Sequence, residues 1–338
     1  MPRTPPRILL LRLSSIGDVI LTTPLIRVLR RRHPDAHLAY CTRPAFAPLV
    51  AEHPALDDLI VFDPKTEPLG TLARRLRAGR FTHLLDLHGV LRTRALRLMV
   101  PGRWRGYRKR RVARAALIRF KRNLYLDAVP EAERFFEAAR GLDVQPDGDP
   151  AELFLSAAAR ERAGQWLARH GLADAPFVVL APGAAHFTKR WPVEHWSELA
   201  RDLAAQGREL LVVGGPEDVA AGDAIARAAG TRGRSAAGLF SLQETAAALA
   251  AARAVVAGDT GVMHMATAMR TPVVTLFGPT VRAFGFAPYR APAAILERDL
   301  PCRPCSAQGG PACPLGHHRC LRDIVPADVV GALAHWTA

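Results

Sequence analysis

The stretch LRLSSIGDVILTTP, Leu11 to Pro24, changes character halfway along its length. An aliphatic run that is typical of a buried strand ends at two serines, a glycine and Asp18, and apolar residues then recur at helical spacing. A strand that passes through a short polar loop into a helix is the first unit of an αβ fold. A buried core has no use for a carboxylate at this point, so Asp18 either caps the helix or serves a site that needs a charge.

The same alternation of apolar runs and helical patterns continues beyond this stretch. Further strand-like runs lie at 37–41, 59–62 and 83–87, and helix-like segments separate them. Strands that alternate with helices predict parallel strands joined by crossover helices, which is the α/β class.

A break in this pattern predicts the domain boundary. The sequence DVQPDGDP at 143–150 is rich in Pro, Gly and Asp, a composition typical of linkers. Strand-like runs then resume at 177–181, 209–213, 254–257 and 273–277. We therefore expect two αβ domains, 1–150 and 151–338, that face each other across a central cleft, with the last helix a candidate to pack back on the first domain.

The composition is that of a globular protein. The chain has 338 residues, of which 49% are hydrophobic and 23% charged, and this length is enough for two cores. No apolar run approaches the roughly 18 residues that a membrane span needs, and the run at 8–13 is too short for a signal peptide. The sequence therefore predicts a cytoplasmic protein.

The charge is strongly basic and locally clustered. A net charge of +15 predicts a polyanionic partner, either nucleic acid, an anionic membrane face or a phosphate-rich substrate. A genome that favours arginine would explain the total but not the clustering. Between residues 102 and 123 there are ten Arg or Lys and no Asp or Glu, with Trp104, Tyr107 and Phe120 interleaved. This basic stretch predicts a contact surface for phosphates in the first domain.

Four polar loops follow predicted strands, at the edge where αβ sheets bind ligands. Three of them combine glycines with a helix start, whose free N–H groups favour anions. The four loops lie at 14–18, at 182–183 continuing to 188–192, at 214–217, and at 258–261 continuing to His264. The three loops of the second domain predict a nucleotide or nucleotide-sugar site. A Walker lysine loop and a Gly-x-Gly-x-x-Gly after the first strand are both absent from the sequence, which argues against a P-loop NTPase or a standard NAD enzyme.

Single residues in these loops suit particular parts of such a ligand. Lys189, between a strand end and a helix start, is placed to meet a diphosphate, although an exposed surface lysine is the alternative. A carboxylate beside a phosphate would be repelled, so Asp259 is assigned to sugar hydroxyls or to capping, and Thr260 and Gly261 to the phosphates. Glu217 could accept hydrogen bonds from ribose hydroxyls, or could simply stabilise a first helical turn.

At this point the sequence resembles a known family. The motifs LRLSSIGDVILTTPLI, KRWPVEHWSELA, GDTGVMHMATAM and TLFGPT, in this order, resemble the bacterial lipopolysaccharide heptosyltransferases of glycosyltransferase family 9. The resemblance implies a GT-B fold of two Rossmann-like αβ domains, with the acceptor in the first and the nucleotide sugar in the second. It also implies an ADP-heptose donor, inversion at the anomeric carbon and no metal cofactor required for catalysis.

The resemblance also implies roles for individual residues. Asp18 matches the general base, and Lys189, with Thr188 beside it, matches the diphosphate-binding lysine. The remaining substrate-binding matches are Ser14, Ser15, Gly17, Glu217, Asp259, Thr260, Gly261 and His264. Residues 184–185 are alanines where some relatives carry hydroxyl residues, which places donor contacts there in question.

These matches give the opening loop a function. Asp18 would take the proton of the acceptor hydroxyl as it attacks, and Lys189 would stabilise the charge that grows on the leaving diphosphate. The acceptor would be lipid A–Kdo or a heptosyl core at the cytoplasmic face of the inner membrane, where the protein would be peripheral, with no nucleic acid as partner. Two alternatives stay open: a GT-B glycosyltransferase with another nucleotide sugar, and a non-catalytic polyanion-binding αβ protein.

Four of the five cysteines gather near the C-terminus. Cys302, Cys305, Cys313 and Cys320 have a Cys-x2-Cys start that suits a tetrahedral structural zinc site, in which His317 or His318 could substitute. Buried free thiols are the alternative, and a cytoplasmic setting makes disulfides the less expected state. In either case we expect the cysteines to hold the C-terminal segment rather than to take part in the chemistry.

Overall fold

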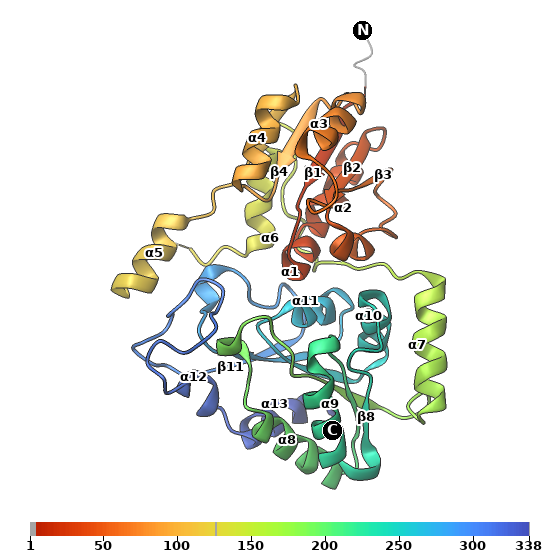
Figure 1. Ribbon diagram of the computed structural model, residues 1–338, viewed down its shortest axis with the longest axis vertical. Helices are drawn as coiled ribbons and strands as arrows, with labels where there is room; N and C mark the ends of the chain where they lie inside the picture. The colour runs from red at the N-terminus through yellow and green to blue at the C-terminus, as the bar shows by residue number, and fades with distance from the viewer. Residues whose placement is uncertain (1–4, 126, 338) are drawn as a thin grey trace. The chain divides into compact units, whose positions relative to one another are not determined.

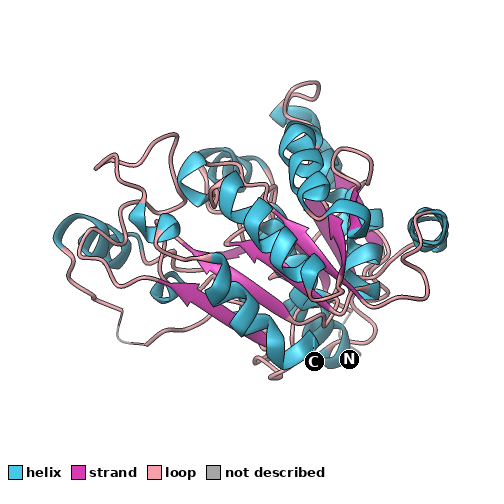
Figure 2. Ribbon diagram, turned by 90° about the horizontal axis from the view of Figure 1, so that it is seen from below, coloured by secondary structure: helices cyan, strands magenta, loops and turns pink. Residues whose placement is uncertain are grey.

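The computed structural model describes residues 5–125 and 127–337, and the chain divides into two compact units. Unit 1 comprises Met1–Lys109 and Val129–Phe154, and unit 2 comprises Arg110–Ala128 and Leu155–Ala338. Each unit contains one sheet with helices packed against it (Figures 1 and 2). None of the helices in the described part of the chain is long and apolar enough to cross a membrane.

The sheet of unit 1 is entirely parallel, in the order β3-β2-β1-β4-β5. Its strands are β1 (Arg7–Leu11), β2 (His37–Thr42), β3 (Asp58–Val61), β4 (His83–Asp86) and β5 (Arg103–Gly106). Its helices are α1 (Ile16–Ile20), α2 (Thr23–Arg32), α3 (Leu69–Ala78), α4 (Leu91–Met99) and α6 (Glu131–Arg134). In this register Leu11 lies opposite both Cys41 and Asp86, so the loops after β1 and β4 begin side by side.

The sheet of unit 2 is also parallel, in the order β11-β10-β9-β6-β7-β8. Its strands are β6 (Phe177–Ala181), β7 (Glu209–Val212), β8 (Gly233–Ser235), β9 (Ala254–Gly258), β10 (Val273–Phe277) and β11 (Ala293–Glu297). Its helices are α5 (Arg111–Phe120), α7 (Ala157–Arg169), α8 (Val193–Ala205), α9 (Val219–Ala228), α10 (Leu242–Ala251), α11 (Gly261–Ala268), α12 (Arg319–Arg322) and α13 (Pro326–Thr337). The two parallel sheets with their crossover helices confirm the predicted α/β class.

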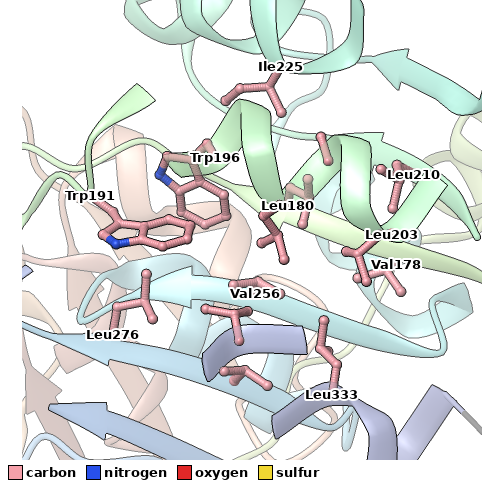
Figure 3. Packing of buried hydrophobic residues seen from close by; sticks show 14 of the residues in the cluster. Val178, Leu180, Trp191, Trp196, Leu203, Leu210, Ile225, Val256, Leu276 and Leu333 are labelled. Atoms are coloured by element: carbon pink, nitrogen blue, oxygen red, sulfur yellow. The ribbon is translucent and has the colours of Figure 1, made fainter. Parts of the chain in front are cut away.

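The core of unit 2 explains why its central strands read as uninterrupted apolar runs. Every residue of β6, β9 and β10 is buried, as expected for parallel strands covered on both faces. Figure 3 shows Trp191 and Trp196 packed with Leu180, Val256 and other aliphatic side chains of this core. The strands are therefore rigid supports for the loops that follow them.

Three details of the domain organisation differ from the sequence prediction. The boundary between the units lies after Phe154 rather than after residue 150. The last helix, α13, buries Val329 and Leu333 in the core of its own unit 2, because these side chains complete the layer beside α8.

The third difference concerns the basic stretch at 102–123, which is divided between the units. Its first part, with β5, belongs to unit 1, whereas α5 belongs to unit 2. Leu117 of α5 packs with Tyr125 and Phe284, and Lys121 donates hydrogen bonds to the carbonyls of Cys302 (2.9 Å) and Pro304 (2.7 Å). The prediction that the whole stretch lies in the first domain was therefore wrong, because these contacts bind α5 to unit 2.

Candidate active site

The first candidate region lies at the carboxyl edge of the unit 1 sheet, around Asp18. Asp18 is in the first turn of α1, and its Oδ2 accepts hydrogen bonds from the backbone N–H (3.1 Å) and hydroxyl (2.8 Å) of Ser15. Ser15, not Asp18, is the N-cap residue of this helix. The alternative that Asp18 is itself the helix cap was therefore wrong, although Asp18 does stabilise the helix start through its Oδ2 contacts with Ser15.

The other carboxylate oxygen of Asp18, Oδ1, forms an ion pair with Arg12 Nη2 at 2.5 Å. Burial by itself would raise the pKa of Asp18, but the charge of Arg12 and the hydrogen bonds from Ser15 outweigh it and hold the pKa below its usual value. Asp18 is consequently a carboxylate, and not a carboxylic acid, at neutral pH.

Arg12 is held in place by several groups besides Asp18. Its Nε donates to the carbonyl of Ser14 (2.6 Å), and its Nη1 donates to the carbonyl of Leu87 (2.5 Å) and to Tyr107 Oη (3.4 Å). The guanidinium also lies 5.7 Å from the centre of the Phe135 ring. With only 8% of its side chain exposed, Arg12 is a fixed positive charge behind Asp18.

A histidine at the same sheet edge was not singled out from the sequence. The backbone N–H of Leu13 donates to His88 Nδ1 at 3.1 Å, which leaves the ring proton of a neutral His88 on Nε2. Burial, followed by the charges of Arg12 and Lys109, lowers the pKa of His88 to about 4, so the ring is neutral at pH 7. His88 can therefore donate a hydrogen bond to a ligand through Nε2 but cannot act as a base there. The available signal was that His88 and Gly89 directly follow the predicted strand at 83–87.

The second candidate region lies at the carboxyl edge of the unit 2 sheet, around Lys189. The loops after β9, β6 and β7 carry it, and these three strands are neighbours in the sheet. Lys189 Nζ donates to Asp259 Oδ2 (2.7 Å) and to the Asp259 carbonyl (2.9 Å). Asp259 Oδ2 also accepts a hydrogen bond from Thr280 Oγ1 at 2.6 Å. Asp259 thus holds Lys189 in this structure, a role that the sequence did not predict, and Thr280 is a further residue that it did not single out.

Glycine at position 258 allows the Lys189 and Asp259 loops to approach each other. A side chain at this position would begin 3.2 Å from the backbone carbonyl of Lys189. The next residues open α11: Thr260 is its N-cap, Gly261 begins the helix, and His264 is buried one turn further on. Thr260 Oγ1 is buried and has no hydrogen-bond partner among residues 5–125 and 127–337, so it can still bind a ligand.

The other two predicted residues of this region differ in their surroundings. Glu217 is exposed on the short helix Pro216–Asp218 after β7, where a ligand can reach it. Thr188 is buried, and its hydroxyl exchanges hydrogen bonds with the backbone N–H (2.8 Å) and carbonyl (3.2 Å) of Gly310. In this structure Thr188 therefore fixes the cysteine-containing segment to the Lys189 loop.

The predicted zinc site is not formed. Within the described ranges, no three His, Cys, Asp or Glu side chains are arranged so that they could hold a metal ion. Cys320 is buried in the hydrophobic core of unit 2, whereas Cys302 Sγ lies 3.9 Å from His317 Nε2. Burial raises the pKa of Cys320 to about 11, helped by the other cysteines nearby, so its thiol is neutral. All four are free thiols in this structure, but only Cys320 is buried, so the alternative of buried free thiols holds for Cys320 alone.

Comparison with known proteins defines the class to which this fold and these two regions belong. Over 98% of both chains, the protein superposes on the ADP-heptose LPS heptosyltransferase II of Escherichia coli with a TM-score of 0.74 and 25% sequence identity. The fold is therefore that of the GT-B glycosyltransferases, as the resemblance implied.

Sequence comparison gives the family. The model of glycosyltransferase family 9 (heptosyltransferase) matches residues 69–314. Lipopolysaccharide heptosyltransferase 1 of Pseudomonas aeruginosa is 32% identical over 88% of this chain and 86% of its own length. Lipopolysaccharide heptosyltransferase 2 of Salmonella typhimurium is 27% identical over 97% of each. The chain belongs to glycosyltransferase family 9, and it is a glycosyltransferase.

Proposed function

We propose that this enzyme transfers heptose from ADP-heptose to the inner core of lipopolysaccharide, either to lipid A–Kdo or to a heptosyl core, with inversion at the anomeric carbon. The names of its relatives support heptose as the transferred sugar, and the name of the E. coli structure supports ADP as the carrier. The observation that carries the proposal is the Asp18 carboxylate, held ionised by Arg12 at a strand edge.

Asp18 is the general base in this proposal. The acceptor hydroxyl oxygen forms the new bond to the anomeric carbon, its proton passes to Asp18, and the bond from that carbon to the diphosphate breaks. Asp18 meets the requirements of this step because it is ionised and its side chain is 16% exposed, whereas Arg12 behind it is more deeply buried. Ser14, Ser15 and Gly17 would shape the loop, and His88 would donate a hydrogen bond to the acceptor.

Lys189 stabilises the leaving ADP. Two of its three ammonium hydrogens are donated to Asp259, and a phosphate oxygen can accept the third. As the bond to the anomeric carbon breaks, negative charge grows on the diphosphate and its attraction to Lys189 increases. Neither step needs a metal ion, so we propose that none is required for catalysis.

The remaining loop residues would bind the rest of the donor. Thr260, through its unpartnered hydroxyl, and Gly261, through its backbone N–H at the start of α11, are placed to donate to phosphate oxygens. His264 would contribute to the same loop, and the exposed Glu217 would accept hydrogen bonds from the ribose. Asp259 would act on the donor through Lys189, with Thr188 acting through the loop that it fixes.

The acceptor is built on a lipid, so we propose that the enzyme works as a peripheral protein at the cytoplasmic face of the inner membrane. The strongly basic segment, part of which lies in each unit, suits the phosphates and carboxylates of such an acceptor.

Release of ADP from ADP-heptose tests this function. We expect release to depend on a truncated lipopolysaccharide core acceptor, and to be far slower when ADP-glucose replaces ADP-heptose. Equal release from both donors would identify a different sugar specificity, and no release with any core acceptor would contradict the proposed function.

A further inference from the structure

The segment between Asp86 and Asp127 has an unusual composition. It contains thirteen Arg or Lys and no Asp or Glu. It also holds five of the twelve large apolar side chains that are exposed in the described structure: Leu91, Leu98, Val112, Phe120 and Leu124. Single exposed apolar side chains are ordinary, but this concentration within one acid-free segment is not.

Helix α5 of unit 2 carries two of these side chains, Val112 and Phe120. Its inner face is formed by Leu117, with Ala113 and Ile118, and packs on Tyr125 and Phe284. The side chains of Val112 and Phe120 are 79% and 69% exposed. At 100° per residue they lie about 80° apart around the helix, and Arg119 lies about 20° beyond Val112, on the side away from Phe120. The outer face of α5 is thus both apolar and basic.

Helix α4 of unit 1 likewise has a buried inner face and an outer face that is both apolar and basic. Its inner face buries Leu96 in the unit 1 core. Leu91 and Leu98 are 82% and 91% exposed, and because they are seven residues apart, they lie on one face, with Arg94 beside them. Each unit therefore carries one helix, drawn in orange to yellow in Figure 1, whose outer face combines arginines with large apolar side chains.

We propose that α4 and α5, each by its own outer face, dock on an anionic lipid bilayer. The arginines bind the headgroup phosphates, and Leu91, Leu98, Val112 and Phe120 enter the boundary with the acyl chains. This inference deepens the proposed function, on which it rests for the membrane as the place of work, by naming the surface that makes the contact.

The composition of the two faces favours a bilayer over other partners. Nucleic acid would use the arginines, but three of the four inserted side chains are aliphatic and offer no stacking surface to bases. A second copy of this chain, paired through the same face, would place arginines against arginines. A lipid surface satisfies the charges and the apolar side chains at the same time.

Co-sedimentation of the full chain with vesicles tests the proposal without any heptose transfer. We expect binding to vesicles that mix phosphatidylglycerol with phosphatidylcholine, and little binding to phosphatidylcholine alone. The arginines should make part of the binding salt-sensitive, and the apolar side chains should leave a part that survives high salt. The double variants Leu91→Ser/Leu98→Ser and Val112→Ser/Phe120→Ser should each lower the high-salt partition coefficient by about tenfold.

Leu239→Ser is the matched control, because Leu239 is 65% exposed but lies outside the basic segment. It should bind vesicles like the parent, and both it and Leu91→Ser/Leu98→Ser, which lie outside residues 102–123, should keep the parent's ADP-heptose turnover with a water-soluble core acceptor. The proposal is overturned if the double variants bind vesicles as the control does. It is also overturned if they lose duplex DNA binding or self-association while vesicle binding is unchanged.

Discussion

The two candidate regions each contain a buried ion pair at the carboxyl edge of a parallel sheet. The two pairs differ in which charge is the more exposed: the carboxylate in unit 1 and the ammonium group in unit 2. In unit 1, Asp18 is 16% exposed and its partner Arg12 only 8%. In unit 2, Lys189 is 15% exposed and its partner Asp259 only 7%. The member that we propose to meet substrate is the more exposed one in each pair, an anion in the first and a cation in the second.

The more buried member of each pair is itself held by further hydrogen bonds. Arg12 donates to the carbonyls of Ser14 and Leu87, and Asp259 accepts from Thr280. A buried charge with several partners provides a fixed field at the position of the reacting group. The same device can therefore serve proton removal in one unit and leaving-group stabilisation in the other.

The largest expected effect comes from Asp18→Ala. This change removes the proposed base and leaves Arg12 as a buried charge without its counterion. We expect turnover to fall about 10²–10⁴-fold and the free energy of unfolding to fall by about 3–5 kcal/mol. Steady-state ADP release measures the loss of turnover, and denaturant unfolding measures the loss of stability. A stable and active variant would show that the Arg12–Asp18 pair of unit 1 serves neither purpose.

Lys189→Ala should affect donor binding as well as the rate. A charge that contacts the diphosphate acts in both the ground state and the transition state, so we expect ADP to bind at least about tenfold more weakly and turnover to fall further. Calorimetric titration of ADP measures the first effect. Unchanged ADP affinity would show that Lys189 serves only to pair with Asp259.

Arg12→Gln should change the pH dependence of the reaction. Arg12 lowers the pKa of Asp18, so without it burial will raise that pKa and the acid limb of kcat/KM will move to higher pH. The ionised Asp18 stabilises the parent above the pKa of an unfolded Asp, about 4, and this stability is lost as the pH falls through the folded pKa. The stability that the ionised Asp18 contributes should be smaller in Arg12→Gln than in the parent.

The groups that surround Asp18 decide what this experiment can show. Tyr40, His88 and Tyr107 also lie within electrostatic reach of Asp18, and all three are neutral at pH 7, since burial raises the pKa of both tyrosines and lowers that of His88. The shift should therefore be assignable to Arg12, and Arg12→Lys should restore most of the parent profile. An unmoved acid limb would show that Arg12 does not control the base.

Thr280→Val should have the smallest effect. It removes one hydrogen bond to Asp259 while the size of the side chain is kept, so we expect about 1 kcal/mol less stability and ADP affinity lowered by only a few-fold. Thermal melting and ADP titration test this. A loss as large as that of Lys189→Ala would give Thr280 a direct contact with the donor.

The sequence predicted the fold and the four loops because both depend on local pattern. Buried parallel strands appear as continuous apolar runs, and their polar ends mark the ligand-binding edge. The contacts between residues of different loops, by contrast, could not be predicted from local sequence pattern. Lys189 and Asp259 are 70 residues apart, and their contact depends on β6 and β9 being neighbours. His88 reaches Leu13 only because β4 lies beside β1.

Two other predictions failed because they followed chain order or spacing. The basic stretch is continuous in sequence, yet α5 packs on Phe284, more than 160 residues away. The cysteine spacing suits zinc, but Cys320 is placed by the apolar residue beside it, Leu321, in the unit 2 core. Tertiary packing decided both outcomes, and neither local composition nor spacing contains that information.

Turnover of Asp18→Asn tests the central claim most directly, because Asn keeps the size of the side chain and an oxygen that can accept from Ser15, but cannot take a proton. Arg12 loses its countercharge in this variant, so we expect the variant to be less stable than the parent. Turnover should therefore be measured well below the melting temperature of the variant. We predict turnover about 10²–10⁴-fold below the parent, with ADP affinity within about twofold of it. An Asp18→Asn enzyme with nearly full activity would contradict the account and leave Asp18 as a stabiliser of the helix start.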